Sequence, residues 1–161
     1  MTKGRKFMAT LKQSDLAILL LMATNGVGAQ EVITPQDASP ALGGYSPVSY
    51  FEHEEPRLGS PEHQATHDGT TYYFTSGAQR ERFLANPERF APLFPYHCPY
   101  NLALGRAASI DPTNFRIVAD RLLLFHRSEE MDGLEKWNQH EAAEKEELLE
   151  RARGNFKLIE F

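Results

Sequence analysis

The feature that most constrains the fold is the Asp68-Gly69 dipeptide, which stands directly before a β-branched and aromatic run, Thr70–Thr75. Asp-Gly is typical of a two-residue hairpin turn, because glycine adopts positive φ without strain and aspartate tolerates it. Residues 63–76 are therefore expected to form a β-hairpin. A second hairpin is predicted over residues 115–126, where the continuous apolar run Leu122–Phe125 indicates a buried strand.

Helix signals surround these hairpins. Ser76 and Gln79 have the spacing of a capping box, which predicts that a helix begins just after the first hairpin. Four helical segments are expected, at residues 76–86, 87–90, 101–104 and 134–154. We therefore predict an α+β fold in which two hairpins form a small antiparallel sheet with short helices. A C-terminal helix, anchored by Trp137, is expected to pack across that sheet.

The N-terminal region has the pattern of an export signal. A basic segment is followed by the short apolar run Leu16–Ala23 and by small residues, with Val27 and Ala29 at the −3 and −1 positions of a cleavage site. The pattern predicts a signal peptide at residues 1–29 and a periplasmic or secreted protein; an N-terminal membrane anchor is the alternative. The apolar run is shorter than the roughly 20 residues that span a bilayer, so no stable membrane insertion is expected after cleavage. Residues 30–41 are expected to form a linker.

The charge of the chain argues against nucleic acid as a partner. Four of the 17 basic residues and one of the 22 acidic residues lie in the predicted signal peptide, which leaves a mature chain with a formal net charge of −8. Contacts to phosphates need clustered lysine and arginine, and the mature sequence has no such cluster. The chain has one cysteine, Cys98, which cannot form an internal disulfide.

Several landmarks occur in a fixed order along the chain, at residues 42–51, 72–76, 83–92, 96–100, 104–105, 111–125 and 137–138. They resemble exported YHS domain proteins, whose opening motif "GYDPVAYF" corresponds to GYSPVSYF at residues 44–51 of this chain. The resemblance covers residues 42–157. It implies a small α+β domain related to metal-binding modules, without an established reaction.

The sequence departs from the family pattern at possible metal ligands. Related metal-sensing domains often carry cysteines around the first hairpin and the helix after it, whereas this chain has Thr75–Ala78 there. A site with several cysteines is therefore absent. The family motif "GGYCA" is replaced by residues 95–99, Pro-Tyr-His-Cys-Pro, and the "DG" of the second hairpin is replaced by Ala119-Asp120.

Cys98 is the first candidate for a functional residue. It precedes Pro99 and is expected at the N-cap of a short helix, where the helix dipole favours a thiolate. A thiolate beside the imidazole of His97 suits Cu(I) or Zn(II), and His126 at the end of the second hairpin is the predicted third ligand. His63 and His67 are alternative third ligands. Two other roles for Cys98 stay open, namely a buried structural thiol and a redox-active or intermolecular half-cystine.

Other candidate sites are weaker. His63 and His67 are four residues apart, but on a strand this spacing spans about 13 Å, so the two are not expected to chelate one ion. A thiol enzyme built on Cys98 would need an oriented base and an oxyanion hole, and no segment resembles one. The acidic run 141–150 is expected to be a solvated helix face.

The leading hypothesis from the sequence is an exported, non-enzymatic metal-binding module for copper or zinc. Copper is preferred for a thiolate with an imidazole. The alternative is a metal-free adaptor that docks an envelope protein through exposed aromatic residues or the acidic C-terminal helix. The sensitivity of metal binding to replacement of Cys98 separates these hypotheses.

Overall fold

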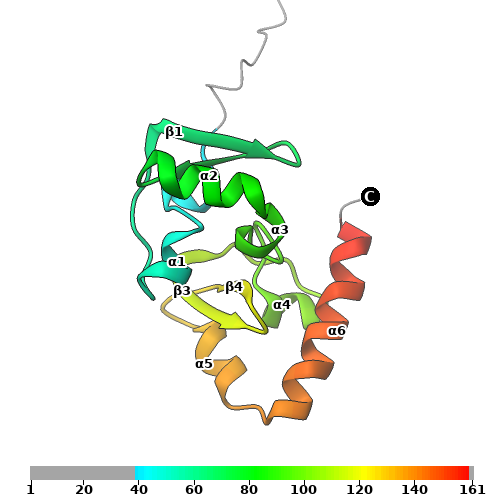
Figure 1. Cartoon of the computed structure of the whole chain (residues 1–161). Coiled ribbons are helices and arrows are strands. Elements are labelled where there is room, and N and C mark those ends of the chain that lie inside the picture. Colours follow the sequence, from blue (N-terminus) through cyan, green and yellow to red (C-terminus); the bar gives the residue numbers. More distant parts are fainter. Residues whose placement is uncertain (1–38, 160–161) are drawn as a thin grey trace, which may run out of the picture. The chain divides into compact units, whose positions relative to one another are not determined.

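The computed structural model describes residues 39–159 and confirms the α+β class (Figure 1). The elements are η1 (Ala41–Gly44, a 3-10 helix), α1 (Ser49–Glu52), β1 (Ser60–His67), β2 (Thr70–Phe74), α2 (Gly77–Ala85), α3 (Pro87–Phe90), α4 (Pro99–Ala103), β3 (Asp111–Val118), β4 (Arg121–Phe125), α5 (Gly133–Asn138) and α6 (Ala142–Ile159). The predicted signal peptide and most of the predicted linker lie outside the described residues.

The first predicted hairpin is confirmed. β1 and β2 pair antiparallel, with His67 opposite Thr70 at the turn end. Asp68 has a φ of 47° and Gly69 a φ of 73°, as the two-residue turn requires. The pairing register shifts between Ser60 and Gln64, so the far end of the hairpin is irregular.

The predicted helix start after this hairpin is also confirmed. The Ser76 hydroxyl accepts a hydrogen bond from the backbone N–H of Gln79 at 3.3 Å. The reciprocal contact differs from the usual capping box, because Gln79 Oε1 accepts from the N–H of Thr75. α2 ends at Ala85, and Asn86 then caps α3, which has Pro87 at its first position.

The second hairpin is confirmed, but the expectation of one shared sheet is wrong. β3 and β4 pair antiparallel and form their own two-stranded sheet, separate from that of β1 and β2. One physical reason is that the edge of β4 away from β3 is already covered, because the N–H of Leu93 in the loop after α3 donates to the carbonyl of Leu122 at 3.0 Å. Both faces of β4 are also buried. Leu122 and Leu124 pack into one core, whereas Leu123 and Phe125 pack into another, as the alternation of side chains along a strand dictates.

The two cores share β4 and otherwise draw mainly on different parts of the chain. The first core contains the aromatic residues of the N-terminal half, and the rings of Tyr72 and Phe74 each lie 5.0 Å from the ring of Phe83 in α2. The second core lies between β4 and the C-terminal helices. Its buried members are Phe94, Cys98, Leu102, Ala103, Leu123, Phe125, Trp137, Leu148 and Ala152.

The predicted C-terminal helix at residues 134–154 is two helices, so the prediction of a continuous helix is wrong. Asp132 caps α5, its carboxylate accepting from the N–H groups of Leu134 and Glu135. α5 ends at Asn138, and the carboxylate of Glu144 then accepts from the N–H of Glu141, at the start of α6. The break lets Trp137, only 2% exposed, reach the core while α6 takes a new direction.

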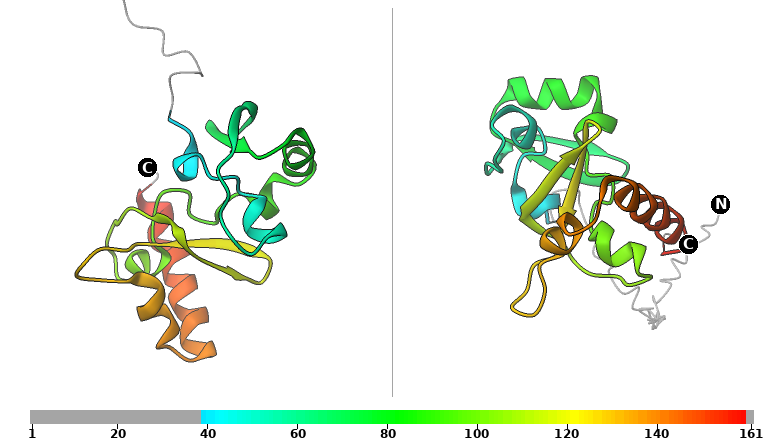
Figure 2. Two further views of the ribbon diagram at one scale, coloured as in Figure 1. Left: turned by 90° about the vertical axis from the view of Figure 1, so that its left-hand side faces the viewer. Right: turned by 90° about the horizontal axis from the view of Figure 1, so that it is seen from below.

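α6 lies alongside α4 (Figure 2). The Asn155 amide of α6 donates a hydrogen bond to the carbonyl of Leu102 at 2.7 Å, which fixes the contact. Among the helices of residues 39–159, none combines the length and the apolar character needed to cross a membrane.

Candidate metal centre

Cys98 is the N-cap of α4, as predicted, but its thiol faces the second core. It is 0% exposed, and it makes no side-chain capping hydrogen bond. The Sγ atom lies against Gly133, where an added Cβ would stand only 2.9 Å away. This is the environment of a buried structural thiol, the alternative that the sequence left open.

His97 and His126 do not join Cys98. The Nδ1 atom of His126 lies 2.9 Å from the carbonyl oxygen of Ser109, and His97 packs its ring against Phe156. Within residues 39–159, the donor atoms of the three predicted ligands do not lie within 4.8 Å of one another. The predicted ligand set is therefore not assembled. Cys98 has an extended backbone, with a φ of −68° and a ψ of 121°, and neighbouring side chains on extended backbone point to opposite sides.

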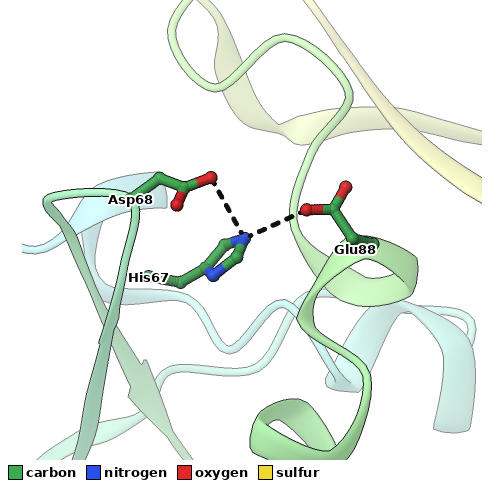
Figure 3. Close-up of side chains that lie close together, drawn as sticks. All are labelled: His67, Asp68 and Glu88. Carbon is green, nitrogen blue, oxygen red and sulfur yellow. Dashed lines mark ion pairs between the residues drawn. The ribbon is translucent and has the colours of Figure 1, made fainter.

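A different group of donors does converge. His67 Nε2 lies 3.4 Å from Asp68 Oδ2 and 3.4 Å from Glu88 Oε1 (Figure 3). The three donor atoms all lie within 4.8 Å of one another. We call His67, Asp68 and Glu88 the HDE cluster.

The fold positions each member of the HDE cluster by a local device. His67 is the last residue of β1, and its ring stands edge-on to Phe83, with centroids 6.1 Å apart. Asp68 occupies the first turn position at positive φ. Glu88 lies in the first turn of α3, directly after Pro87. The two carboxylates thus come from a tight turn and a helix start and meet at one imidazole nitrogen.

The spacing in the HDE cluster suits a small divalent ion. Four ligands at about 2.1 Å from a tetrahedral zinc ion stand about 3.4 Å apart, which matches the two separations measured at His67 Nε2. Two carboxylates and one imidazole are hard or borderline donors, which favour zinc over Cu(I). Because a metal binds imidazole and carboxylate only in their deprotonated forms, a proton and a metal would compete for the site.

Exposure differs within the HDE cluster. The His67 side chain is 23% exposed, whereas those of Asp68 and Glu88 are 85% and 72% exposed. The imidazole is therefore largely enclosed by neighbouring residues, whereas the two carboxylates are accessible from solvent. Three protein ligands would leave a fourth position open for water or another ligand.

The HDE cluster borders a pocket of about 440 Å³. The pocket also contains residues from β2, β4, α6 and the loop after α3. Its lining residues outside the HDE cluster are Thr70, Tyr72, Ala91, Pro92, Leu93, Pro95, Tyr96, His97, Arg121, Phe156 and Ile159. Burial, together with nearby Tyr96 and Asp68, raises the pKa of Tyr72 well above its ordinary value, so its hydroxyl stays protonated.

Sequence reasoning did not find the HDE cluster as a whole. It identified His67 as a possible ligand and Asp68 as a turn residue, and their adjacency at a hairpin turn was the available signal. Glu88 lies 21 positions beyond His67 in the sequence, and only the packing of α3 against the hairpin brings it near.

Comparisons with protein-family models, with curated proteins and with solved structures find no match. The resemblance to exported YHS domain proteins therefore stays a prediction from the sequence.

Proposed function

We propose that this chain is an exported, YHS-like metal-binding module that binds a divalent ion of the zinc type through the HDE cluster. The observation that carries the proposal is the convergence of two carboxylate oxygens on His67 Nε2, each at 3.4 Å. The proposal keeps the metal-binding function predicted from the sequence, and it replaces Cys98, His97 and His126 as the ligands. Export rests on the pattern of residues 1–29.

Zinc is a better candidate than copper at this site. Cu(I) prefers thiolate and thioether ligands, and neither occurs in the HDE cluster. The fixed imidazole provides one strong ligand, and the two exposed carboxylates can adjust to the ion. A module with an open fourth position would carry or present the ion rather than bury it as a structural centre.

The test is a zinc titration of the metal-stripped protein by calorimetry. His67→Ala, Asp68→Asn and Glu88→Gln are each expected to weaken zinc binding by about tenfold or more, because each removes or weakens a ligand. His63→Ala is the matched control: it removes a partly buried histidine from the same strand but outside the HDE cluster, and zinc affinity should not change. The affinity should also fall as the pH falls, because protons compete for the ligands.

Two results would contradict the proposal. Zinc binding that is lost in Cys98→Ala and kept in His67→Ala would show that Cys98, and not the HDE cluster, holds the ion. A wild-type protein that binds no zinc would favour the alternative of a metal-free adaptor, for which crosslinking to an envelope protein is the next experiment.

A further inference from the structure

Arg121 is unusual among the arginines of the described chain. Only three arginines within residues 39–159 are partly buried rather than exposed, and these are Arg80, Arg121 and Arg153. Arg80 pairs with Glu81, and Arg153 pairs with Glu150. Arg121 forms no ion pair or side-chain hydrogen bond with another described residue, and its Nε atom is buried without a partner. Buried polar atoms are normally hydrogen-bonded, so the covered Nε atom of this guanidinium lacks an expected partner.

The fold holds Arg121 at the pocket. It is the first residue of β4 and stands opposite Val118 in the second hairpin, next to the buried run that begins at Leu122. Its side chain lines the same pocket as the HDE cluster. Because the Nε atom is covered, the terminal nitrogens of the guanidinium are the atoms that can meet a ligand.

His97 adds a second donor to the same pocket. Its Nδ1 atom is buried and has no hydrogen-bond partner among residues 39–159, and its ring lies 6.0 Å from that of Phe156. The Nε2 atom is therefore the ring nitrogen that can bind a ligand. Nearby, the Tyr96 hydroxyl lies 3.4 Å from the Thr70 hydroxyl, which places two more polar groups on the wall.

Apart from the Tyr72 hydroxyl, the rest of the lining is apolar, with Ala91, Pro92, Leu93 and Phe156 among its members. A cavity of about 440 Å³ falls within the usual size range for small-molecule sites. A ligand that suits it has an apolar body and one anionic end. The two carboxylates of the HDE cluster disfavour a multiply charged anion such as phosphate, because only Arg121 supplies a permanent positive charge there.

We infer that this pocket binds a small organic monocarboxylate, with its carboxylate paired to the guanidinium of Arg121 and assisted by His97. The planar guanidinium matches a carboxylate through two parallel hydrogen bonds. The apolar wall would hold the body of the ligand. This inference goes beyond metal binding and does not depend on it, although a divalent ion at the HDE cluster would neutralise Asp68 and Glu88 and so strengthen anion binding.

The test uses benzoate as the probe and benzamide as its neutral isostere, titrated into the purified protein in EDTA and followed by amide chemical shifts. Benzoate should perturb the signals of Arg121 and His97 and should bind about tenfold more tightly than benzamide, as a charge-assisted pair predicts. Arg121→Gln should remove this preference. Arg121→Lys should keep part of it, because lysine retains the charge but lacks the paired N–H donors of the guanidinium. Arg116→Gln is the matched control, since Arg116 is an exposed arginine on the partner strand and does not line the pocket.

Three results would overturn the inference. Benzoate and benzamide could bind equally, or not at all, or Arg121→Gln could leave benzoate affinity unchanged while the variant stays folded. Ile159 lines the pocket, so removal of residues 160–161 is a further control. A tenfold gain in benzoate affinity on that removal would mean that residues 160–161 are the natural partner of Arg121, and it would also overturn the inference of a small-molecule site. Because the titration is run in EDTA, a failure of zinc binding would leave its outcome unaffected.

Discussion

Replacement of Gly133 by alanine tests the packing of the second core most directly. Gly133 is the first residue of α5 and its φ lies outside the left-handed region, so alanine would ordinarily be favoured there by about 0.5–1 kcal/mol. The surroundings reverse this expectation. An added Cβ would stand 2.9 Å from Cys98 Sγ, 3.3 Å from the carbonyl oxygen of His126 and 3.4 Å from its nitrogen.

The neighbours of Gly133 have little freedom to move. Its own N–H donates to the His126 carbonyl at 2.8 Å, and Cys98 is enclosed by the core. Overpacking of this kind costs about 1–3 kcal/mol, so we expect Gly133→Ala to lower the free energy of unfolding by about 1–2 kcal/mol after the helix preference is included. With an m-value of about 2 kcal/mol/M, the urea midpoint should fall by about 0.5–1 M.

Two companion variants make the urea measurement decisive. Gly154 lies within α6, where an added Cβ would meet no described atom within 4 Å apart from the neighbouring helix backbone, so Gly154→Ala should raise stability by about 0.5–1 kcal/mol. In Gly133→Ala combined with Cys98→Ala, the closest contact is gone, so the loss should be smaller than the sum of the two single losses. If Gly133→Ala stabilised the protein as Gly154→Ala does, the described contact between α5 and the thiol would be refuted.

Two further predictions concern charge and turn geometry. The Asn114 amide and, to a lesser extent, the N–H of Glu135 and the Arg127 side chain lower the pKa of Asp132 from 3.8 to about 2. The charged Asp132 therefore stabilises the fold above the unfolded pKa, and this contribution is lost as the pH falls from about 4 to about 2. Urea unfolding should show that the difference in free energy of unfolding between wild type and Asp132→Asn shrinks across that pH range. Ala119 has a φ of 47°, so Ala119→Gly should raise the thermal midpoint, with a gain of about 1 kcal/mol; an unchanged or lower midpoint would show that the turn is not strained.

Local signals in the sequence were sufficient for most elements. Asp68-Gly69 predicted the first hairpin, Ser76 predicted the start of α2, and Pro99 placed Cys98 at a helix N-cap. Each signal acts within a few residues and depends on backbone chemistry that does not need the rest of the fold. The continuous run Leu122–Phe125 correctly indicated a buried strand, but it did not show that the two faces belong to different cores.

The candidate site was harder to predict because it depends on packing. Residue chemistry selected Cys98, His97 and His126, yet Cys98 faces a core and His97 faces the pocket. The HDE cluster depends on the approach of α3 to the turn of the first hairpin, and no local pattern around Glu88 signals that approach. Arg121 likewise appears in the sequence as an ordinary strand residue.

The position of β4 has a consequence for how the protein can come apart. Because alternate residues of one strand contribute to both cores, neither core can be opened while the other stays intact. The two small sheets therefore do not define two independent folding units, and the chain should lose its structure in one cooperative step. The pocket is lined from both sides of this arrangement, by Tyr72 of one core and Phe156 of the other, so its shape is coupled to the stability of the whole described domain.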